Sequence, residues 1–230
     1  MVMSQNIKIA VDAVVFGYQQ DTLYVLLIQQ KFDGQESYWA LPGGLVKDNE
    51  SLISAVTREL KEETNVDINF MEQLYTFGDD LNRDSRNRVI SVAYFALIDS
   101  SKTNIKADTD ADKVQWFPVK DVPALAFDHN LILQRAIERL KAKLTYQPVG
   151  FDLLPKEFLF SDLENLYCTI LEKEIDRRNF RKKILSFDIV EETDRFSEKK
   201  AGRPAKLFRF NSAKYKALEK GGFHFEIKFA

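Results

Sequence analysis

The segment GGLVKDNESLISAVTRELKEETNV, residues 43–66, constrains this chain more than any other. It places Glu59, Glu62 and Glu63 on a predicted helix that follows a Gly-Gly turn. Positions i and i+4 of a helix share a face, so Glu59 and Glu63 can point at one ion with Glu62 beside them. Clustered carboxylates suit Mg²⁺, which binds a few protein oxygens together with the phosphates of a substrate. The segment predicts a helix that holds a metal against a diphosphate.

The same segment matches the Nudix box: Gly, five residues, Glu, seven residues, Arg-Glu, an aliphatic, any residue, Glu-Glu, any residue, Gly and an aliphatic. Eight positions of the pattern are filled by Gly44, Glu50, Arg58, Glu59, Leu60, Glu62, Glu63 and Val66. The late Gly is replaced by Asn65, the next most tolerant residue in the left-handed conformation that ends a helix. The alternative is a solvated acidic helix with i,i+4 pairs such as Arg58 with Glu62.

Composition narrows the class of protein. The 230 residues suit one large or two small domains, and no apolar run is long enough to span a membrane. The single cysteine, Cys168, excludes an internal disulfide and favours a reducing cytoplasm; its apolar surroundings predict a buried thiol. Residues 176–209 hold 11 Lys or Arg against 6 acids, a net charge of +5, which leaves −7 to the rest of a chain whose total is −2. A polyanionic partner is therefore expected for the C-terminal part alone.

The first 145 residues alternate strand-like and helix-like patterns, which predicts a layered α+β domain. The expected strands are 7–17, 22–30, 69–78, 88–98 and 114–119. The expected helices run from about Ser51, as the cap, to Thr64, and over 130–143.

The remainder has a different organisation. Residues 146–155, with two prolines and a glycine, predict a linker between domains 1–145 and 156–230. After it we expect a helix over 162–171 capped by Ser161, a basic helix over 177–187 capped by Asp176, and a hairpin formed by 187–191 and 206–210. Helix, turn, basic helix and hairpin is the order of a winged helix.

Both parts resemble known families. The first resembles Nudix hydrolases of the ADP-ribose pyrophosphatase kind in YWALPGG, the box, RDSRNRVISVAYFALI and WFPVKDVPALAFDH. The last 80 residues resemble the DNA-binding part of Nudix-related transcriptional regulators in FDLLPKEF, DRRNFRKKI and GRPAKLFRF. The NrtR repressors of NAD metabolism and AraR-like regulators of sugar metabolism belong to that group. The resemblance implies a Nudix α/β/α sandwich followed by a winged helix-turn-helix domain.

The resemblance also implies a metal site and its chemistry. Glu59 and Glu63, with the Gly43 carbonyl, are expected to bind Mg²⁺ or Mn²⁺, with Glu62 taking part in catalysis. Arg58 and Glu50 are expected to orient the helix and its loop. A general base is expected from the loop ADTDADK, with Asp108, Asp110 and Asp112 as candidates and Asp112 preferred.

Other residues are expected to bind ligands or DNA. Arg83, Arg86 and Arg88 are candidates for contacting a phosphate or ribose, although they can equally be exposed loop arginines. Phe32 is a candidate for stacking on a base; core packing is expected for Trp39 and a structural hydrogen bond for His129. The expected DNA contacts are Arg177, Arg178, Asn179, Arg181 and Lys182 on the basic helix, and Lys199, Lys200 and Arg203 in the wing.

Two functions follow from these expectations. The favoured one is a homodimeric transcriptional regulator that binds double-stranded operator DNA and senses ADP-ribose, a related nucleotide or a pentose. The alternative is a Mg²⁺-dependent Nudix hydrolase that cleaves a nucleoside diphosphate derivative such as ADP-ribose. The regulator accounts for the basic C-terminal part, and the hydrolase accounts for the nearly complete acidic box.

Overall fold

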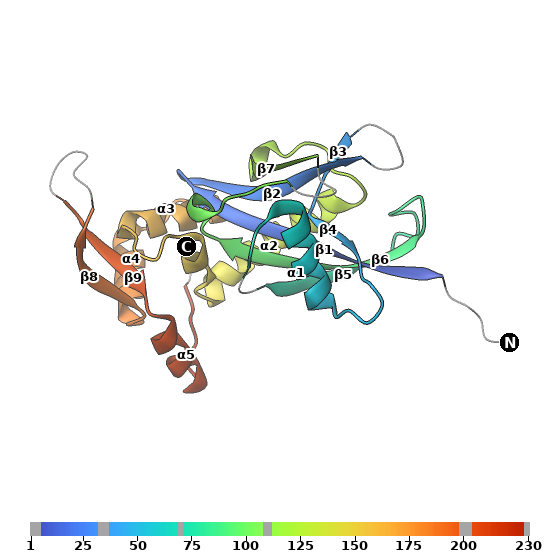
Figure 1. Ribbon diagram of the computed structural model, residues 1–230. Coiled ribbons are helices and arrows are strands. Elements are labelled where there is room, and N and C mark those ends of the chain that lie inside the picture. The colour runs from blue at the N-terminus through green and yellow to red at the C-terminus, as the bar shows by residue number, and fades with distance from the viewer. Residues whose placement is uncertain (1–5, 32–36, 69–70, 108–111, 198–203, 228–230) are drawn as a thin grey trace. The chain divides into compact units, whose positions relative to one another are not determined.

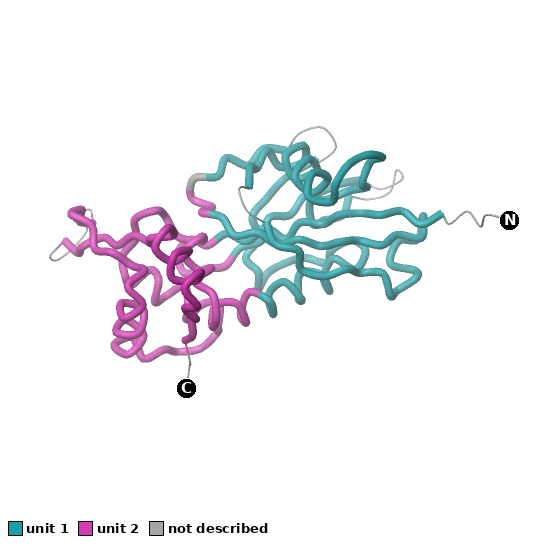
Figure 2. Tube along the Cα trace, turned by 90° about the horizontal axis from the view of Figure 1, so that it is seen from below, with its two compact units in different colours: residues 1–17, 24–98, 102–139 teal, residues 18–23, 99–101, 140–230 magenta. Residues whose placement is uncertain are grey.

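The computed structural model describes residues 6–31, 37–68, 71–107, 112–197 and 204–227. The chain forms two compact units (Figure 2). Unit 1 comprises Met1–Gly17, Tyr24–Ile98 and Lys102–Arg139, and unit 2 comprises Tyr18–Leu23, Asp99–Ser101 and Leu140–Ala230. No helix in the described part of the chain is both long and apolar enough to cross a membrane.

A mixed sheet, with seven strands among the described residues, forms the centre of unit 1 (Figure 1). The main path runs β3-β2-β1-β6-β5, with β4 paired to β1 and β7 to β2. Strands β1 and β6 are parallel over their whole shared length, whereas β4 pairs with β1 in the antiparallel sense. The strands are β1 (Ile7–Gln19), β2 (Thr22–Lys31), β3 (Ser37–Ala40), β4 (Gly43–Leu45), β5 (Glu72–Phe77), β6 (Arg88–Ile98) and β7 (Lys113–Pro118).

Two helices cover the two faces of this sheet, as Figures 1 and 2 show. They are α1 (Leu52–Thr64) and α2 (His129–Tyr146), and short 3-10 turns occur at η1 (Ser100–Lys102) and η2 (Val119–Asp121). Val56 and Leu60 of α1 pack against Val11 of β1 and Val92 of β6 in one buried cluster. This burial fixes which face of α1 meets the sheet and leaves its glutamate face toward β4.

The ends of α1 follow from its sequence. Ser51 has extended backbone and its hydroxyl accepts the Ser54 N–H at 3.2 Å, so it caps the helix as predicted. Asn65 has a φ of 58°, and its N–H donates to the Lys61 carbonyl at 3.0 Å. Asn65 therefore takes the left-handed place expected of a Gly.

The glycine pair before α1 is a strand and not the turn that we predicted. Gly43 and Gly44 belong to β4, and neither has a positive φ. A Cβ on Gly43 would lie 2.2 Å from the Val11 carbonyl oxygen, and a Cβ on Gly44 would lie 2.5 Å from Glu59 Oε1. Glycine is required at position 43, because the backbone there passes against β1, whereas a Cβ at position 44 would displace the Glu59 carboxylate.

Unit 2 contains a winged helix. Its elements are η3 (Val149–Leu153), α3 (Phe160–Leu171), α4 (Arg177–Ser186), the hairpin β8 (Val190–Phe196) with β9 (Lys206–Phe210), and α5 (Ser212–Lys220). Phe158 exchanges two backbone hydrogen bonds with Phe208 of β9, at 2.8 and 2.9 Å, which ties the start of α3 to the wing. Phe160 and Phe180 fill the space between α3 and α4.

Several details of unit 2 differ from the sequence predictions. The segment 146–155 is folded: α2 continues to Tyr146, and η3 buries Phe151 and Leu153. Ser161 does not cap α3, because the helix begins at Phe160 and Ser161 lies inside its first turn; the Asp162 carboxylate accepts the Leu159 N–H at 3.0 Å. Asp176 caps α4 as predicted. Two further differences are the helix α5, which was not predicted, and Cys168, which is only half-buried.

Candidate functional site

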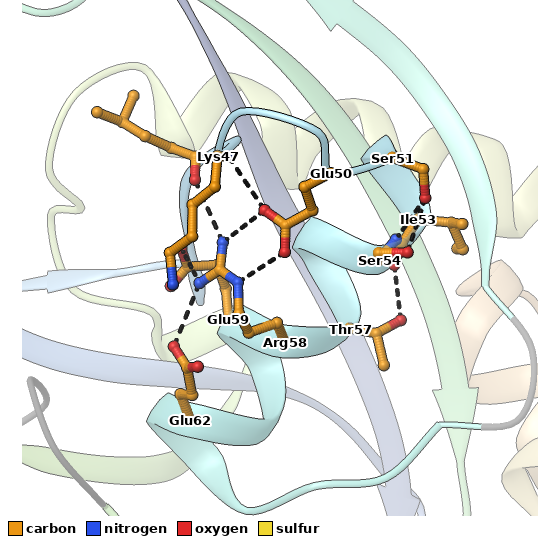
Figure 3. A network of polar contacts seen from close by, with 10 residues as sticks. Lys47, Glu50, Ser51, Ile53, Ser54, Thr57, Arg58, Glu59 and Glu62 are labelled. Carbon is orange, nitrogen blue, oxygen red and sulfur yellow. Dashed lines mark hydrogen bonds and ion pairs between the residues drawn. The ribbon is translucent and has the colours of Figure 1, made fainter.

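The guanidinium of Arg58 organises the acidic helix α1 (Figure 3). It donates two hydrogen bonds to Glu50, at 2.7 and 2.9 Å, one to Glu59 at 2.7 Å and one to Glu62 at 3.2 Å. These bonds hold the pKa of Glu50 at about 2. Arg58 and Glu50 were expected to orient the helix and its loop, and the bonds between them anchor the loop before α1 to the helix.

Glu63 lies on the buried side of the same helix. Its side chain accepts the Gly43 N–H at 2.8 Å and a short hydrogen bond from the Gln30 amide. Burial raises the pKa of Glu63 to about 8, helped by repulsion from Glu59 and Asp12. A cation bound here would favour the ionised carboxylate and so offset both the cost of its burial and the repulsion.

The glutamates of α1 have the oxygen ligands that a hard cation such as Mg²⁺ prefers, and their carboxylates converge on β4. Within the residues that the structure describes, no group of three His, Cys, Asp or Glu side chains is close enough to hold an ion. The fit therefore rests on Glu59 and Glu63. The Gly44 backbone beside Glu59 leaves no room for a Cβ.

A cavity of about 180 Å³ opens beside these residues in unit 1. It brings together β1, β2, the β3–β4 segment, the loop before β6 and the start of α2. Gln30 and Gly43 link it to the glutamate helix, because both contact Glu63 and both line the cavity. Its full lining is Ala10, Asp12, Gln30, Ala40, Leu41, Gly43, Gly44, Leu45, Arg83, Asp84, Arg86, Val89, Phe127 and His129.

A buried polar network forms one wall of this cavity. Asp12, 5% exposed, accepts a short hydrogen bond from Ser91 and lies 3.4 Å from Nε2 of His129. Nδ1 of His129 accepts the Leu41 N–H at 3.0 Å, so the ring proton lies on Nε2 and faces Asp12. The structural hydrogen bond expected of His129 is confirmed.

Arg83 completes the network. It is 8% exposed and donates to both oxygens of Asp128, at 2.6 and 2.9 Å, while lying 3.7 Å from Asp12. Burial raises the pKa of Asp12, but His129, Ser91 and Arg83 outweigh it, so this pKa lies below its ordinary value. The network keeps a fixed negative charge and a fixed guanidinium at the cavity wall.

The three candidate arginines are placed differently. Arg83 and Arg86 line the cavity, and the Arg86 guanidinium lies 5.3 Å from the centre of the Phe127 ring while pairing with Asp84. Arg88 does not line it, and its guanidinium donates to the Gly78 carbonyl at 2.6 Å.

The remaining candidates of unit 1 lie elsewhere. Asp112 is exposed, outside the cavity lining, and accepts a hydrogen bond from Ser37 at 3.3 Å. Trp39 packs edge-to-face on Phe117, as expected of a structural residue. Phe32, Asp108 and Asp110 fall outside the described residues.

Sequence reasoning missed several residues of the site, namely Asp12, Gln30, Phe127 and Asp128. Asp12 carried a usable signal, because it is the one acid within the apolar strand IKIAVDAVVFG. A carboxylate in such a strand is stable only with buried partners. The partners themselves could not be found, because they come from distant parts of the chain.

The basic helix α4 has two kinds of arginine. Arg177 donates to Glu164 at 3.1 Å and to Asn165 at 2.8 Å, and Arg181 lies 4.4 Å from the Phe160 ring centre and 5.2 Å from that of Phe208.

Arg178 and Lys182, one helical turn apart, are exposed on the side away from the buried Phe180. Asn179 donates to Asp176 at 2.7 Å. The wing residues Lys199, Lys200 and Arg203 fall outside the described residues.

A larger cavity, of about 680 Å³, flanks α4 in unit 2. Its lining mixes acids such as Glu174 and Glu226 with Lys182 and Lys183 on the helix that is expected to meet DNA. The smaller cavity of unit 1, with its buried Asp12 network, is the better candidate for a small molecule, since a few fixed polar groups in a cleft are typical of such sites.

Comparisons with known proteins agree with this division. The family model of the NUDIX domain matches residues 6–140, and that of the NrtR DNA-binding winged helix domain matches residues 150–210. An "ADPR responsive transcriptional repressor NtrR" of Acinetobacter baylyi is 37% identical over 205 residues, which cover 87% of this chain and 80% of that protein.

Two solved structures are also similar. The NrtR of Shewanella oneidensis complexed with a 27mer DNA has a TM-score of 0.77 and 30% identity, over 96% of this chain and 99% of the other. The NUDIX domain of the same NrtR complexed with ADP ribose has a TM-score of 0.55 and 36% identity, over 60% of this chain and 90% of the other. With a Nudix unit, an NrtR winged helix and this likeness over nearly its whole length, the chain belongs to the NrtR-type Nudix-related transcriptional regulators.

Proposed function

We propose that this protein is a transcriptional repressor that binds operator DNA through its winged helix and responds to ADP-ribose bound by its Nudix unit. The observation that carries the proposal is the pairing of two sites in one chain. One is a cleft with fixed arginines beside a glutamate helix, and the other is an exposed basic helix followed by a wing. The relatives named for ADP-ribose and for DNA support both halves.

In this proposal Arg86 and Arg83 face the anionic part of the effector. Guanidinium groups suit a diphosphate, because their N–H donors match its oxygens in pairs. The cavity of about 180 Å³ is smaller than the roughly 300 Å³ or more usual for ligand sites. Part of ADP-ribose therefore lies beyond it. A free pentose, the effector that the resemblance to AraR-like regulators suggests, has no phosphate to pair with these arginines.

Hydrolysis is the second candidate function, and the near-complete acidic box favours it. Glu59, Glu63 and the Gly43 carbonyl would hold Mg²⁺ or Mn²⁺, which supplies positive charge to a bound diphosphate. Roles for Glu62 and Asp112 in proton transfer remain predictions. We expect Glu59→Gln to abolish any Mg²⁺-dependent release of AMP from ADP-ribose. Unchanged turnover would show that the box is not the active site.

In the proposed function, helix α4 makes the contacts to the DNA groove. Arg178 and Lys182 are exposed and one turn apart, which suits base edges or phosphates in a major groove. A homodimer would present two such helices to a pseudo-palindromic duplex with half-sites one or more helical turns apart. The wing residues Lys199, Lys200 and Arg203 would add phosphate or minor-groove contacts.

A thermal-shift and calorimetry screen tests the effector. ADP-ribose, AMP, NAD and arabinose are compared with and without Mg²⁺, and a ligand at about 100 times its Kd stabilises the fold by about 2.7 kcal/mol. We expect ADP-ribose to give the largest shift. Arg86→Ala should lose the shift, whereas the matched control Arg88→Ala, outside the cavity lining, should keep it. If arabinose alone raised the melting temperature, arabinose and not ADP-ribose would be the effector.

A further inference from the structure

The tip of the β1–β2 hairpin, residues Tyr18–Leu23 with the turn at its end, belongs to unit 2 and is bonded to α3. Thr169 donates to the backbone carbonyl of Asp21 at 3.3 Å, and the Asn165 amide donates to Asp21 Oδ2, also at 3.3 Å. The Tyr18 hydroxyl donates to Asp21 Oδ1 at 3.0 Å. Both carboxylate oxygens of Asp21 are therefore engaged, one of them by α3.

Asn165 is bonded on its other side to α4. Its Oδ1 accepts Nη2 of Arg177 at 2.8 Å, while Nη1 of Arg177 lies 3.1 Å from the largely buried Glu164. Arg177 is the first residue of α4. An amide side chain donates and accepts at once, so Asn165 can join the turn to the beginning of the basic helix.

The strands that flank this turn also carry residues of the cavity. Asp12 lies on β1 and Gln30 lies on β2, and Gln30 contacts Glu63 of the glutamate helix as well. Coupling between two distant sites can be carried by packed side chains, hydrogen bonds and rigid secondary-structure elements that connect them. The β1–β2 hairpin, followed by Asn165 and Arg177, provides such a connection.

We infer that Asn165 is a positioning residue which, with Asp21 and Arg177, fixes the start of α4 on α3 and makes DNA affinity depend on occupancy of the cavity. This inference rests on the proposed function. Asp21 and Asn165 contact neither effector nor operator in this role, and Arg177, a DNA contact expected from the sequence, is bonded instead to Glu164 and Asn165. Their removal should change the response of DNA binding to ADP-ribose and leave the affinity for ADP-ribose unaltered.

Three variants isolate the connection. Asn165→Asp keeps an acceptor for Arg177 but loses the N–H that Asp21 accepts, and it sets two carboxylates against each other. Asp21→Gly removes the carboxylate at a position whose φ of 56° glycine tolerates without strain. Asp21→Asn is the matched control, because it keeps a side-chain oxygen and tolerates the same backbone conformation.

The measurement is the Kd for duplex DNA with and without saturating ADP-ribose, by fluorescence anisotropy on the full chain, together with the Kd for ADP-ribose by calorimetry. The ratio of the two DNA dissociation constants reports the coupling. We expect it to fall at least about fivefold in Asn165→Asp and in Asp21→Gly, with ADP-ribose affinity within about twofold of wild type. Asp21→Asn should retain the wild-type ratio.

An unchanged ratio in Asp21→Gly overturns the inference while leaving the proposed function intact; this variant decides the matter if Asn165→Asp does not fold. A loss of ADP-ribose affinity equal to the loss of coupling also overturns it, because the residues would then act on the cavity itself. A wild-type chain that fails to bind DNA or ADP-ribose rejects the proposed function, and the inference with it.

Discussion

Arginines of the same helix have different roles according to what each guanidinium touches. Arg178 is exposed on the outer side of α4, whereas Arg181 rests on the rings of Phe160 and Phe208 and so connects α4 to α3 and β9. A cation over an aromatic face at an exposed site contributes about 0.5–1 kcal/mol. Arg181 thus helps to hold the wing against the basic helix.

Substituting these two arginines should separate DNA contact from support. Arg178→Ala is expected to leave stability unchanged, weaken DNA binding and reduce the slope of log K against log salt concentration by about one. Arg181→Ala should cost about 0.5–1 kcal/mol of stability. Urea unfolding measures the stability of each variant, and anisotropy titrations over a salt series measure its DNA affinity and the salt slope. A full loss of one unit of slope in Arg181→Ala, without destabilisation, would instead make Arg181 a phosphate contact.

The buried carboxylate of Asp12 should make stability depend on acid pH. Because its pKa in the folded state lies below the ordinary value of 3.8, its contribution is present above that value and is lost as pH falls through the folded pKa. Asp12→Asn should therefore flatten the fall in Tm below about pH 4.

The exposed Asp112→Asn serves as the control for this measurement and should follow wild type. Parallel curves for wild type and Asp12→Asn would mean that the network with Arg83 and His129 does not hold the charge of Asp12.

At the scale of elements, the C-terminal end of helix α1 depends on its cap residue, Asn65. The left-handed conformation costs roughly 1–2 kcal/mol for residues with a Cβ other than Asn and Asp, and Gly avoids this cost. Asn65→Ala should therefore destabilise the chain by about 1 kcal/mol, while Asn65→Gly should stay within about 0.5 kcal/mol of wild type. Equal effects of the two substitutions in urea unfolding would show that the φ of 58° at Asn65 does not determine the stability of this end.

Elements with strong local signals were predictable. Residues 52–64 combine a Ser cap, helical periodicity and a Gly-like residue, and residues 88–98 form a continuous β-branched and aromatic run; both match α1 and β6. The segment 146–155 was not predictable, because proline and glycine indicate a turn but do not show whether Phe151 is buried. Similarly, Gly43 and Gly44 serve close approach and not a turn, which depends on the position of β1 and Glu59.

The glutamates of helix α1 and the arginines Arg83 and Arg86 were candidates from the sequence, whereas the buried network around Asp12 was not predictable. The glutamates lie within a few residues of one another, so spacing alone brings them together. Asp12, Arg83 and His129 meet through the parallel pairing of β1 with β6 and the placement of α2, which no local pattern contains. Arg83, Arg86 and Arg88 were equal candidates for contacting a phosphate or ribose, and only the fold places the first two, but not Arg88, in the cavity lining.

For the whole molecule, the distribution of charge agrees with DNA binding by the winged helix and effector binding by the Nudix unit. The window 176–209 carries +5 and the remainder −7, so attraction to a polyanion is confined to the winged helix. We propose that Arg83 and Arg86, which line the cavity, supply the fixed donors that a small anionic effector needs within an acidic body. Two distinct sites and a measurable coupling between them are what make such a protein allosteric.

The most direct test is a titration of the full chain with a duplex enriched by in vitro selection, followed by fluorescence anisotropy at fixed salt concentration. We expect specific binding in the absence of effector and a rise in Kd of at least about fivefold with saturating ADP-ribose. A selected duplex whose Kd stays within about twofold on addition of ADP-ribose, or the failure of selection to enrich any duplex, would contradict it.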